Sequence, residues 1–93
     1  MDEAREFEWD AVKRRANIDK HRLDFEDIGP AFDDENALHV PDRRFDYGEE
    51  RVMMIPRCNS VILSIVYTMR GERTRIISAR FANQRERAIY ERG

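Results

Sequence analysis

The sequence predicts an α+β domain in which a small antiparallel β-sheet meander packs against two N-terminal helices and one C-terminal helix. Residues 61–81 form two apolar runs around a glycine, which is typical of a β-hairpin. Helix caps lie on both sides of it: Asp10 precedes an apolar stripe, and Asn83 stands three residues before Glu86. A length of 93 residues favours one core. We therefore expect a single domain over residues 1–93.

The first half of the chain predicts short elements. Residues 7–9 suit a short strand, and Asp10 then begins a helix of about three turns whose basic end is favourable for the helix dipole. Its irregular apolar stripe is formed by Ala11, Val12, Ala16, Ile18 and Leu23. A second cap at Asp24 precedes another helical segment. Gly29 and Pro30 should kink or split that segment.

The second half predicts the meander and the last helix. Strands are expected at 37–40, 51–55, 61–69 and 73–81. A polar connection over 41–50 contains a turn near Asp46 to Gly48. The capping box at Asn83 begins the final helix, which Ile89 and Tyr90 are expected to dock against the sheet.

Composition indicates a soluble globular protein, because 41% of the residues are hydrophobic and 39% are charged. The single Cys58 cannot form an internal disulfide, no apolar run reaches membrane length, and residues 1–10 lack the features of a signal peptide. We therefore expect a cytoplasmic protein. With His only at 21 and 39, no metal-ligand spacing is present, and neither a metal nor another cofactor is expected.

Charge is distributed unequally along the chain. Residues 1–50 hold eight Lys or Arg against sixteen acids, whereas residues 51–93 hold nine Arg against three acids. The rear half thus carries +6, and Arg outnumbers Lys by fifteen to two in the whole chain. Guanidinium groups bind phosphate in a planar, bidentate manner. A polyanionic partner is therefore expected at the rear half.

Alternation in the hairpin predicts which side chains share a face. In the first strand the core set is Val61, Leu63, Ile65, Tyr67 and Met69. In the second strand the more apolar set is Ile77, Ala79 and Phe81, which leaves Thr74, Ile76, Ser78 and Arg80 on the opposite face.

Arg70 and Arg80 then share a polar face, and Arg75 is expected on the other one. A two-residue turn would pair residue 70 with residue 73 and mix the faces, so we expect an odd-length loop or a bulge. The polar face suits an RNA backbone. The alternative is that these arginines are solvated strand residues paired with acids.

Three blocks of the chain resemble the BrnT family of bacterial toxins. They are FEWD with KRRANIDKH, the central YGEER, and VYTMRG with RIISAR and ERAIY. The resemblance implies a type II toxin–antitoxin ribonuclease with a RelE-like fold, which cleaves RNA and blocks translation. It also implies a BrnA-like antitoxin that binds operator DNA as a ribbon-helix-helix dimer, wraps the toxin and represses the operon with it. Two departures are Arg22, where the family commonly has Gly, and Pro56-Arg57, where an apolar residue followed by Gly is usual.

The resemblance and the hairpin together give candidate site residues. Metal-free cleavage needs a base for the 2′-hydroxyl, positive charge at the phosphorane and a donor for the leaving oxygen. We expect Arg70 and Arg80 to hold the scissile phosphate with help from Arg51 or Arg75. The proton transfers are left open among Glu49, Glu50, Tyr67 and His21. RNA contacts are expected from Arg70, Arg73, Arg75, Arg80 and Lys13.

Structural roles compete with several of these assignments. His21 suits a partner of the helix dipole, Trp9 suits the core, and Tyr67 should face the core with its hydroxyl at the rim. Glu49 and Glu50 can simply pair with nearby arginines. The competing function is a non-catalytic RNA- or antitoxin-binding module, and the basic half can also serve as the docking surface for an acidic antitoxin segment. A dimer or higher assembly is expected in the toxin–antitoxin complex.

Overall fold

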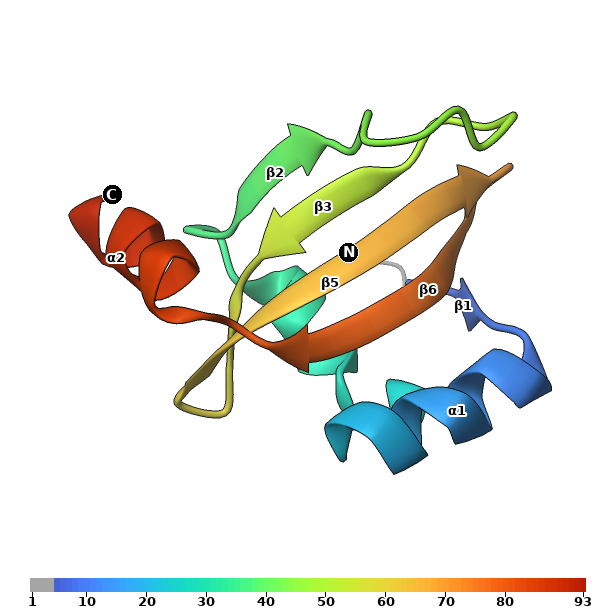
Figure 1. Cartoon of the computed structure of the whole chain (residues 1–93), viewed down its shortest axis with the longest axis horizontal. Coiled ribbons are helices and arrows are strands. Elements are labelled where there is room, and N and C mark those ends of the chain that lie inside the picture. The colour runs from blue at the N-terminus through green and yellow to red at the C-terminus, as the bar shows by residue number, and fades with distance from the viewer. Residues whose placement is uncertain (1–4) are drawn as a thin grey trace.

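A computed structural model describes residues 5–93 and confirms the α+β class (Figure 1). The elements, in chain order, are β1 (Phe7–Glu8), α1 (Ala11–His21), the 3₁₀ segments η1 (Phe25–Asp27) and η2 (Gly29–Asp33), β2 (Leu38–Pro41), β3 (Val52–Ile55), β4 (Arg57–Cys58), β5 (Val61–Arg70), β6 (Arg73–Phe81) and α2 (Gln84–Arg92). No helix within residues 5–93 is long and apolar enough to cross a membrane.

The sheet is mixed, because a parallel strand adds to the expected antiparallel meander. Strand order is β1-β6-β5-β3-β2, with β4 paired to β5 off this path. β2, β3, β5 and β6 form the predicted antiparallel meander. β1 adds to the edge of β6 in parallel, so that Phe7 lies beside Thr74 and Glu8 beside Arg75. A two-residue strand gives too little periodicity for its direction to be read from sequence.

Helix α1 follows β1 along the same edge of β6 (Figure 1). As predicted, Asp10 caps it by accepting a hydrogen bond from the Lys13 backbone N–H at 2.9 Å. Its buried Asn17 donates through Nδ2 to Ala79 O at 2.8 Å and accepts from Ala79 N at 3.1 Å. β1 pairs with β6 at Thr74 and Arg75, and the Asn17 amide forms the hydrogen bonds of a strand partner further along the same edge, at Ala79.

The end of α1 shows why glycine suits position 22. Arg22 is the C-cap and has φ 62°, in the left-handed region where a Cβ atom is unfavourable. This departure from the family pattern thus falls on a residue whose backbone favours glycine.

The second N-terminal helix is not an α-helix. Asp24 caps it as predicted, but Gly29 and Pro30 divide the segment into η1 and η2. The pair is fixed to α1 by Arg14, whose Nε and Nη2 atoms both donate to Asp24 at 2.8 Å. This bidentate contact lowers the pKa of Asp24 to about 2.

The main core lies between one face of the sheet and the segments that follow α1. Phe25 and Ile28 from η1 and its C-cap lie against Met54, Ile65 and Ile76, and each of these side chains is at most 2% exposed. Trp9 packs against Phe25 with ring centroids 6.2 Å apart. The core role predicted for Trp9 is therefore confirmed. We call this side of the sheet the packed face.

The hairpin combines a two-residue turn with a bulge, the second of the two predicted solutions. Arg70 lies opposite Arg73 across Gly71 and Glu72. The register then shifts between Val66 and Tyr67, so that Val66 lies opposite Ser78 while Tyr67 lies opposite Ile76. Ile77 is the extra residue of the bulge. Because of this extra residue, Arg73 and Arg80 lie on the same face of β6 although the two-residue turn would place them on opposite faces.

Helix α2 covers one end of the sheet on the side opposite the packed face. Its predicted capping box is confirmed, with Asn83 and Glu86 each accepting from the other's backbone N–H. Tyr90 packs on the small cluster of Ile55, Ile62 and Ala82. Ile89 is 40% exposed and does not belong to that cluster, so its predicted docking role was wrong.

Candidate functional site

The hairpin arginines all lie on the face of the sheet opposite the core. Thr68 is opposite Arg75 and Ser64 is opposite Arg80, and residues 64, 68 and 70 of β5 alternate onto the same side. We call this side the arginine face; its members are Arg70, Arg73, Arg75 and Arg80 with Ser64, Thr68 and Ser78.

This geometry corrects the predicted placement of Arg75. We placed it away from Arg80 and put Thr74 and Ile76 on the polar face. Thr74 and Ile76 are in fact 0% and 1% exposed in the interior, and Arg75 lies with Arg80. The physical reason is the bulge at Ile77, which inverts the side-chain alternation between the two ends of β6.

Arg80 is held by the C-terminal helix. Its Nη1 and Nη2 atoms donate to the two oxygens of Glu86 at 2.8 and 2.9 Å. Glu86 is 8% exposed and also accepts from the Asn83 backbone N–H at 2.9 Å. The hydrogen bonds from Arg80 lower the pKa of Glu86, and Glu86 raises the pKa of Arg80. The capping box of α2 therefore also orients a guanidinium group of the sheet.

The other hairpin arginines also meet carboxylates, each from a distant part of the chain. Arg75 Nη1 lies 2.7 Å from Glu8 Oε2, Arg73 Nε lies 3.5 Å from Glu6 Oε1, and Arg70 Nη2 lies 3.5 Å from Glu49 Oε1. The alternative of arginines paired with acids is thus realised in the structure. Arg70 and Arg73 remain 53% and 60% exposed, so an incoming phosphate can exchange for their carboxylate partners at little cost.

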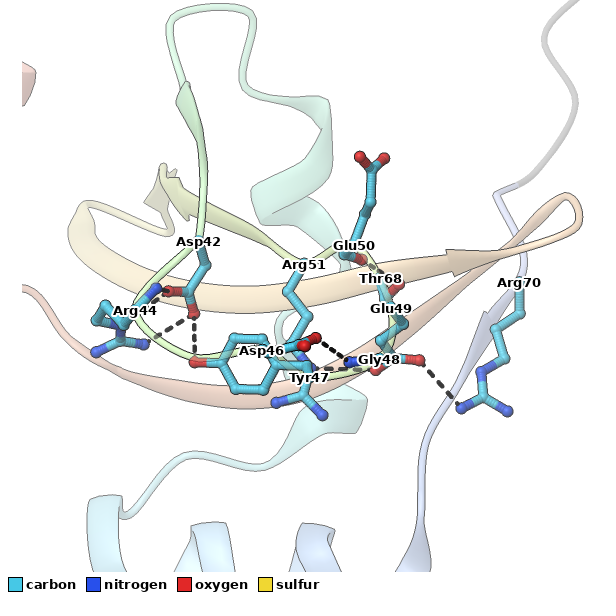
Figure 2. Close-up of polar contacts among 10 residues, drawn as sticks. All are labelled: Asp42, Arg44, Asp46, Tyr47, Gly48, Glu49, Glu50, Arg51, Thr68 and Arg70. Carbon is cyan, nitrogen blue, oxygen red and sulfur yellow. Dashed lines mark hydrogen bonds and ion pairs between the residues drawn. The ribbon is translucent and has the colours of Figure 1, made fainter.

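The connection between β2 and β3 adds a second charged group beside the arginine face (Figure 2). Arg51 lies over the ring of Tyr47 at 4.0 Å, and its Nε atom is 3.1 Å from Glu49. Glu49 thereby joins Arg51 to Arg70. Thr68 Oγ1 donates to Glu50 O at 2.6 Å, which fastens this connection to β5.

The base of the connection is a buried carboxylate. Asp42, 7% exposed, accepts from Arg44 Nε and Nη2 at 2.8 and 2.9 Å and from the hydroxyl of Tyr47 at 3.2 Å. The hydrogen bond from Arg44 lowers the pKa of Asp42 to about 2. Asp42 therefore stays ionised and fixes the ring of Tyr47 at neutral pH.

The four residues considered for proton transfer lie apart. Glu49 faces Arg51 and Arg70, whereas Figure 2 shows the carboxylate of Glu50 pointing away from both. Tyr67 lies on the packed face, as predicted, beside Phe32 with ring centroids 5.4 Å apart. One phosphate on the arginine face therefore cannot also contact Tyr67.

Tyr67 and His21 each have a shifted pKa with a distinct cause. Burial raises the pKa of the Tyr67 phenol, whose oxygen is 3.2 Å from His39 Nδ1. Burial, and then the charges of Lys20 and Arg80, lower the pKa of His21 at the end of α1. A neutral imidazole at neutral pH can accept a proton. Lys13, in contrast, lies on exposed α1 and not on the hairpin.

Sequence reasoning missed the carboxylates that organise the arginines, Glu8 and Glu86, as well as His39 beside Tyr67. Glu86 carried a signal as a capping residue, but its contact with Arg80 depends on how α2 returns across the sheet. Within residues 5–93, no three His, Cys, Asp or Glu side chains are grouped to hold a metal ion.

Comparison with known families gives one match that spans most of the chain. The model for "Ribonuclease toxin, BrnT, of type II toxin-antitoxin system" matches residues 9–86. No curated protein sequence matches significantly. The matched residues run from Trp9 in the core to Glu86 of α2, the partner of Arg80, and so include the whole hairpin.

Proposed function

The chain belongs to the BrnT family of type II toxin–antitoxin ribonuclease toxins, and we propose that it is a metal-independent endoribonuclease that blocks translation by cutting RNA on its arginine face. One observation carries the choice of site: a single face of a rigid hairpin presents four arginines, two of them more than half exposed. Such a surface binds a phosphate backbone and stabilises the charge that develops during cleavage.

The proposed division of labour follows from exposure. Arg70 and Arg73 capture RNA phosphates because they are accessible, while Arg80, held at two points by Glu86, is preorganised to contact the scissile phosphate. Arg51 and Arg75 add positive charge near the same phosphates. Guanidinium groups stay protonated, so these residues stabilise charge and transfer no proton.

For proton abstraction the arrangement favours His21 over Tyr67. Burial, and then the charges of Lys20 and Arg80, lower the pKa of His21, so that its imidazole is available as a proton acceptor at neutral pH. Tyr67 lies on the packed face. Glu49, which contacts Arg51 and Arg70, is the alternative acceptor beside the arginine face. We propose His21 as the base that accepts the 2′-hydroxyl proton.

A type II toxin has an antitoxin partner, and we propose the type of antitoxin from the family resemblance. The partner is a BrnA-like ribbon-helix-helix protein that wraps this chain in the cytoplasm, and the resulting complex, a dimer or higher assembly, binds operator DNA. The helix-and-sheet arrangement of residues 5–93 supports a RelE-like fold.

The test is incubation of purified protein with RNA, with and without ribosomes, followed by mapping of the RNA ends. Wild type should create new ends, and Arg80→Ala should not. Arg15→Ala is the matched control, because Arg15 is 74% exposed on α1 and pairs only loosely with Asp19. If wild type and Arg80→Ala leave RNA equally intact while wild type still arrests growth, the nuclease assignment is wrong.

A non-catalytic role is the second candidate, and the pairing of all four hairpin arginines with acids favours it. In that case the arginines serve assembly with RNA or with the antitoxin. The same incubation separates the two functions, because a binding module would retain RNA without producing new ends.

A further inference from the structure

Two aromatic rings in the β2–β3 connection have no role in the proposed chemistry. Phe45 is 70% exposed, against 51% for Phe81. Its ring meets the ring of Tyr47 edge to face, with centroids 5.8 Å apart. The pair lies in the polar connection that borders the arginine face through Glu49 and Arg70.

Tyr47 is fixed in place, which makes it a support for Phe45. Arg51 covers one side of its ring at 4.0 Å, and its hydroxyl donates to buried Asp42 at 3.2 Å (Figure 2). A cation over an aromatic face and a charge-assisted hydrogen bond together hold the ring at two ends. Phe45 therefore projects into solvent from a rigid base, with little entropy to lose on binding.

The pocket beside these rings is small and rich in carboxylates. It has a volume of about 220 Å³, and its lining includes both rings and the acids Asp42, Asp46, Glu49 and Glu50. That volume is below the roughly 300–1,000 Å³ of sites that enclose a drug-sized ligand. A phosphate would be repelled by the acids, whereas a neutral planar ring with N–H donors would not.

We propose that Phe45 is a stacking platform for one unpaired base of the RNA substrate. The inference rests on the proposed function and adds the substrate class: single-stranded RNA, with phosphates on the arginine face and a neighbouring base against Phe45. Aromatic side chains recognise single strands in this way because every base has a π-face. The pocket borders the arginine face through Glu49 and Arg70, where the RNA backbone is proposed to lie, so a base of the same strand is favoured over the antitoxin as its occupant.

The experiment measures binding of a 2′-O-methyl RNA oligonucleotide, which keeps bases and phosphates but cannot be cleaved through a 2′-hydroxyl. A set of the same oligonucleotides carries one abasic position each. Affinities are compared for wild type, Phe45→Ala and Phe45→Trp. Phe81→Ala is the matched control, because Phe81 is 51% exposed but lies opposite Leu63 on the other side of the sheet.

Phe45→Ala should weaken binding of the intact oligonucleotide roughly tenfold, and Phe45→Trp should preserve it. One abasic position should weaken wild type by a similar factor and leave Phe45→Ala unaffected. The slope of affinity against salt should stay the same, because no phosphate contact is lost.

The proposal is overturned if Phe45→Ala binds every oligonucleotide as wild type does, or if the variant loses affinity only for the antitoxin. In both cases new RNA ends produced by wild type would show that the proposed nuclease function survives. If wild type neither binds nor cuts RNA, the proposed function fails and this inference fails with it.

Discussion

The two faces of the sheet are built on different principles. On the packed face, Phe25, Ile65 and Ile76 are each at most 1% exposed, and the contacts are apolar. On the arginine face, the contacts are ion pairs between the hairpin and carboxylates from β1, the β2–β3 connection and α2. Burial of apolar area stabilises the fold, whereas exposed ion pairs contribute about 0–1 kcal/mol each. The arginine face can therefore exchange partners without unfolding the protein.

The largest expected effect is on the packed face. Phe25→Ala should lower the free energy of unfolding by about 3–5 kcal/mol, because it leaves a cavity among Ile28, Met54 and Trp9. Urea unfolding gives the value. Phe45→Ala, the same substitution at a 70% exposed side chain, should change it by less than about 0.5 kcal/mol. Equal losses in the two variants would abolish the contrast between the faces.

Arg80→Ala should lower the rate of RNA cleavage by about 10²–10³-fold, since it removes a preorganised donor from the arginine face. It also leaves Glu86 with fewer partners, at a cost of about 1–3 kcal/mol in unfolding free energy. Glu86→Gln breaks the same ion pair and retains Arg80, so it measures the stability loss separately. A melting temperature that collapses in Arg80→Ala would show that Arg80 belongs to the framework.

Asn17→Ala should destabilise the protein by about 1–3 kcal/mol, because it leaves Ala79 N–H and C=O without their partner at the edge of β6. Hydrogen exchange at the Ala79 amide should accelerate. Asn36→Ala is the control, since the side chain of Asn36 is exposed. An unchanged exchange rate at Ala79 would mean that α1 does not close this edge in solution.

The smallest expected effect is a pH dependence that differs between two carboxylates. Arginine partners lower the pKa of both Asp24 and Asp42 to about 2. Folded-state pKa values below the ordinary 3.8 mean that each carboxylate stabilises the fold above about pH 4, and that this contribution disappears as the pH falls towards 2.

Melting temperatures between pH 2 and pH 5 test this dependence. Asp24→Asn should flatten the curve, because Asp24 joins α1 to η1 through Arg14. Asp42→Asn should flatten it less, because Asp42 fixes only the β2–β3 connection. If Asp42→Asn flattened the curve more than Asp24→Asn, the β2–β3 connection would contribute more to the stability of the fold than the contact between α1 and η1.

Local signals in the sequence predicted much of this architecture. The two strands of the hairpin, the caps at Asp10 and Asp24, and the box at Asn83 each depend on residues close in sequence. Gly29 and Pro30 likewise explain the division between η1 and η2. Local geometry determines these features, so sequence was sufficient for them.

The features that sequence did not predict depend on long-range pairing. The position of the bulge at Ile77 depends on the length of the turn and on the register of the neighbouring strands. The face on which Arg75 lies depends on that bulge. The partners of Arg75 and Arg80 come from β1 and α2, which no spacing rule relates to the hairpin. Charge counts indicated a basic rear half but not that acidic side chains from the front half would neutralise part of it.

The amide of Asn17 has a consequence for the behaviour of many copies in one solution. A central part of β6 carries a backbone N–H and C=O that would otherwise offer a template to a strand from another molecule. Asn17 occupies both groups with its own side chain, much as a single residue of a neighbouring strand would. The hydrogen bonds that complete the fold thus also leave no free N–H or C=O at Ala79 for a strand of a second chain to pair with.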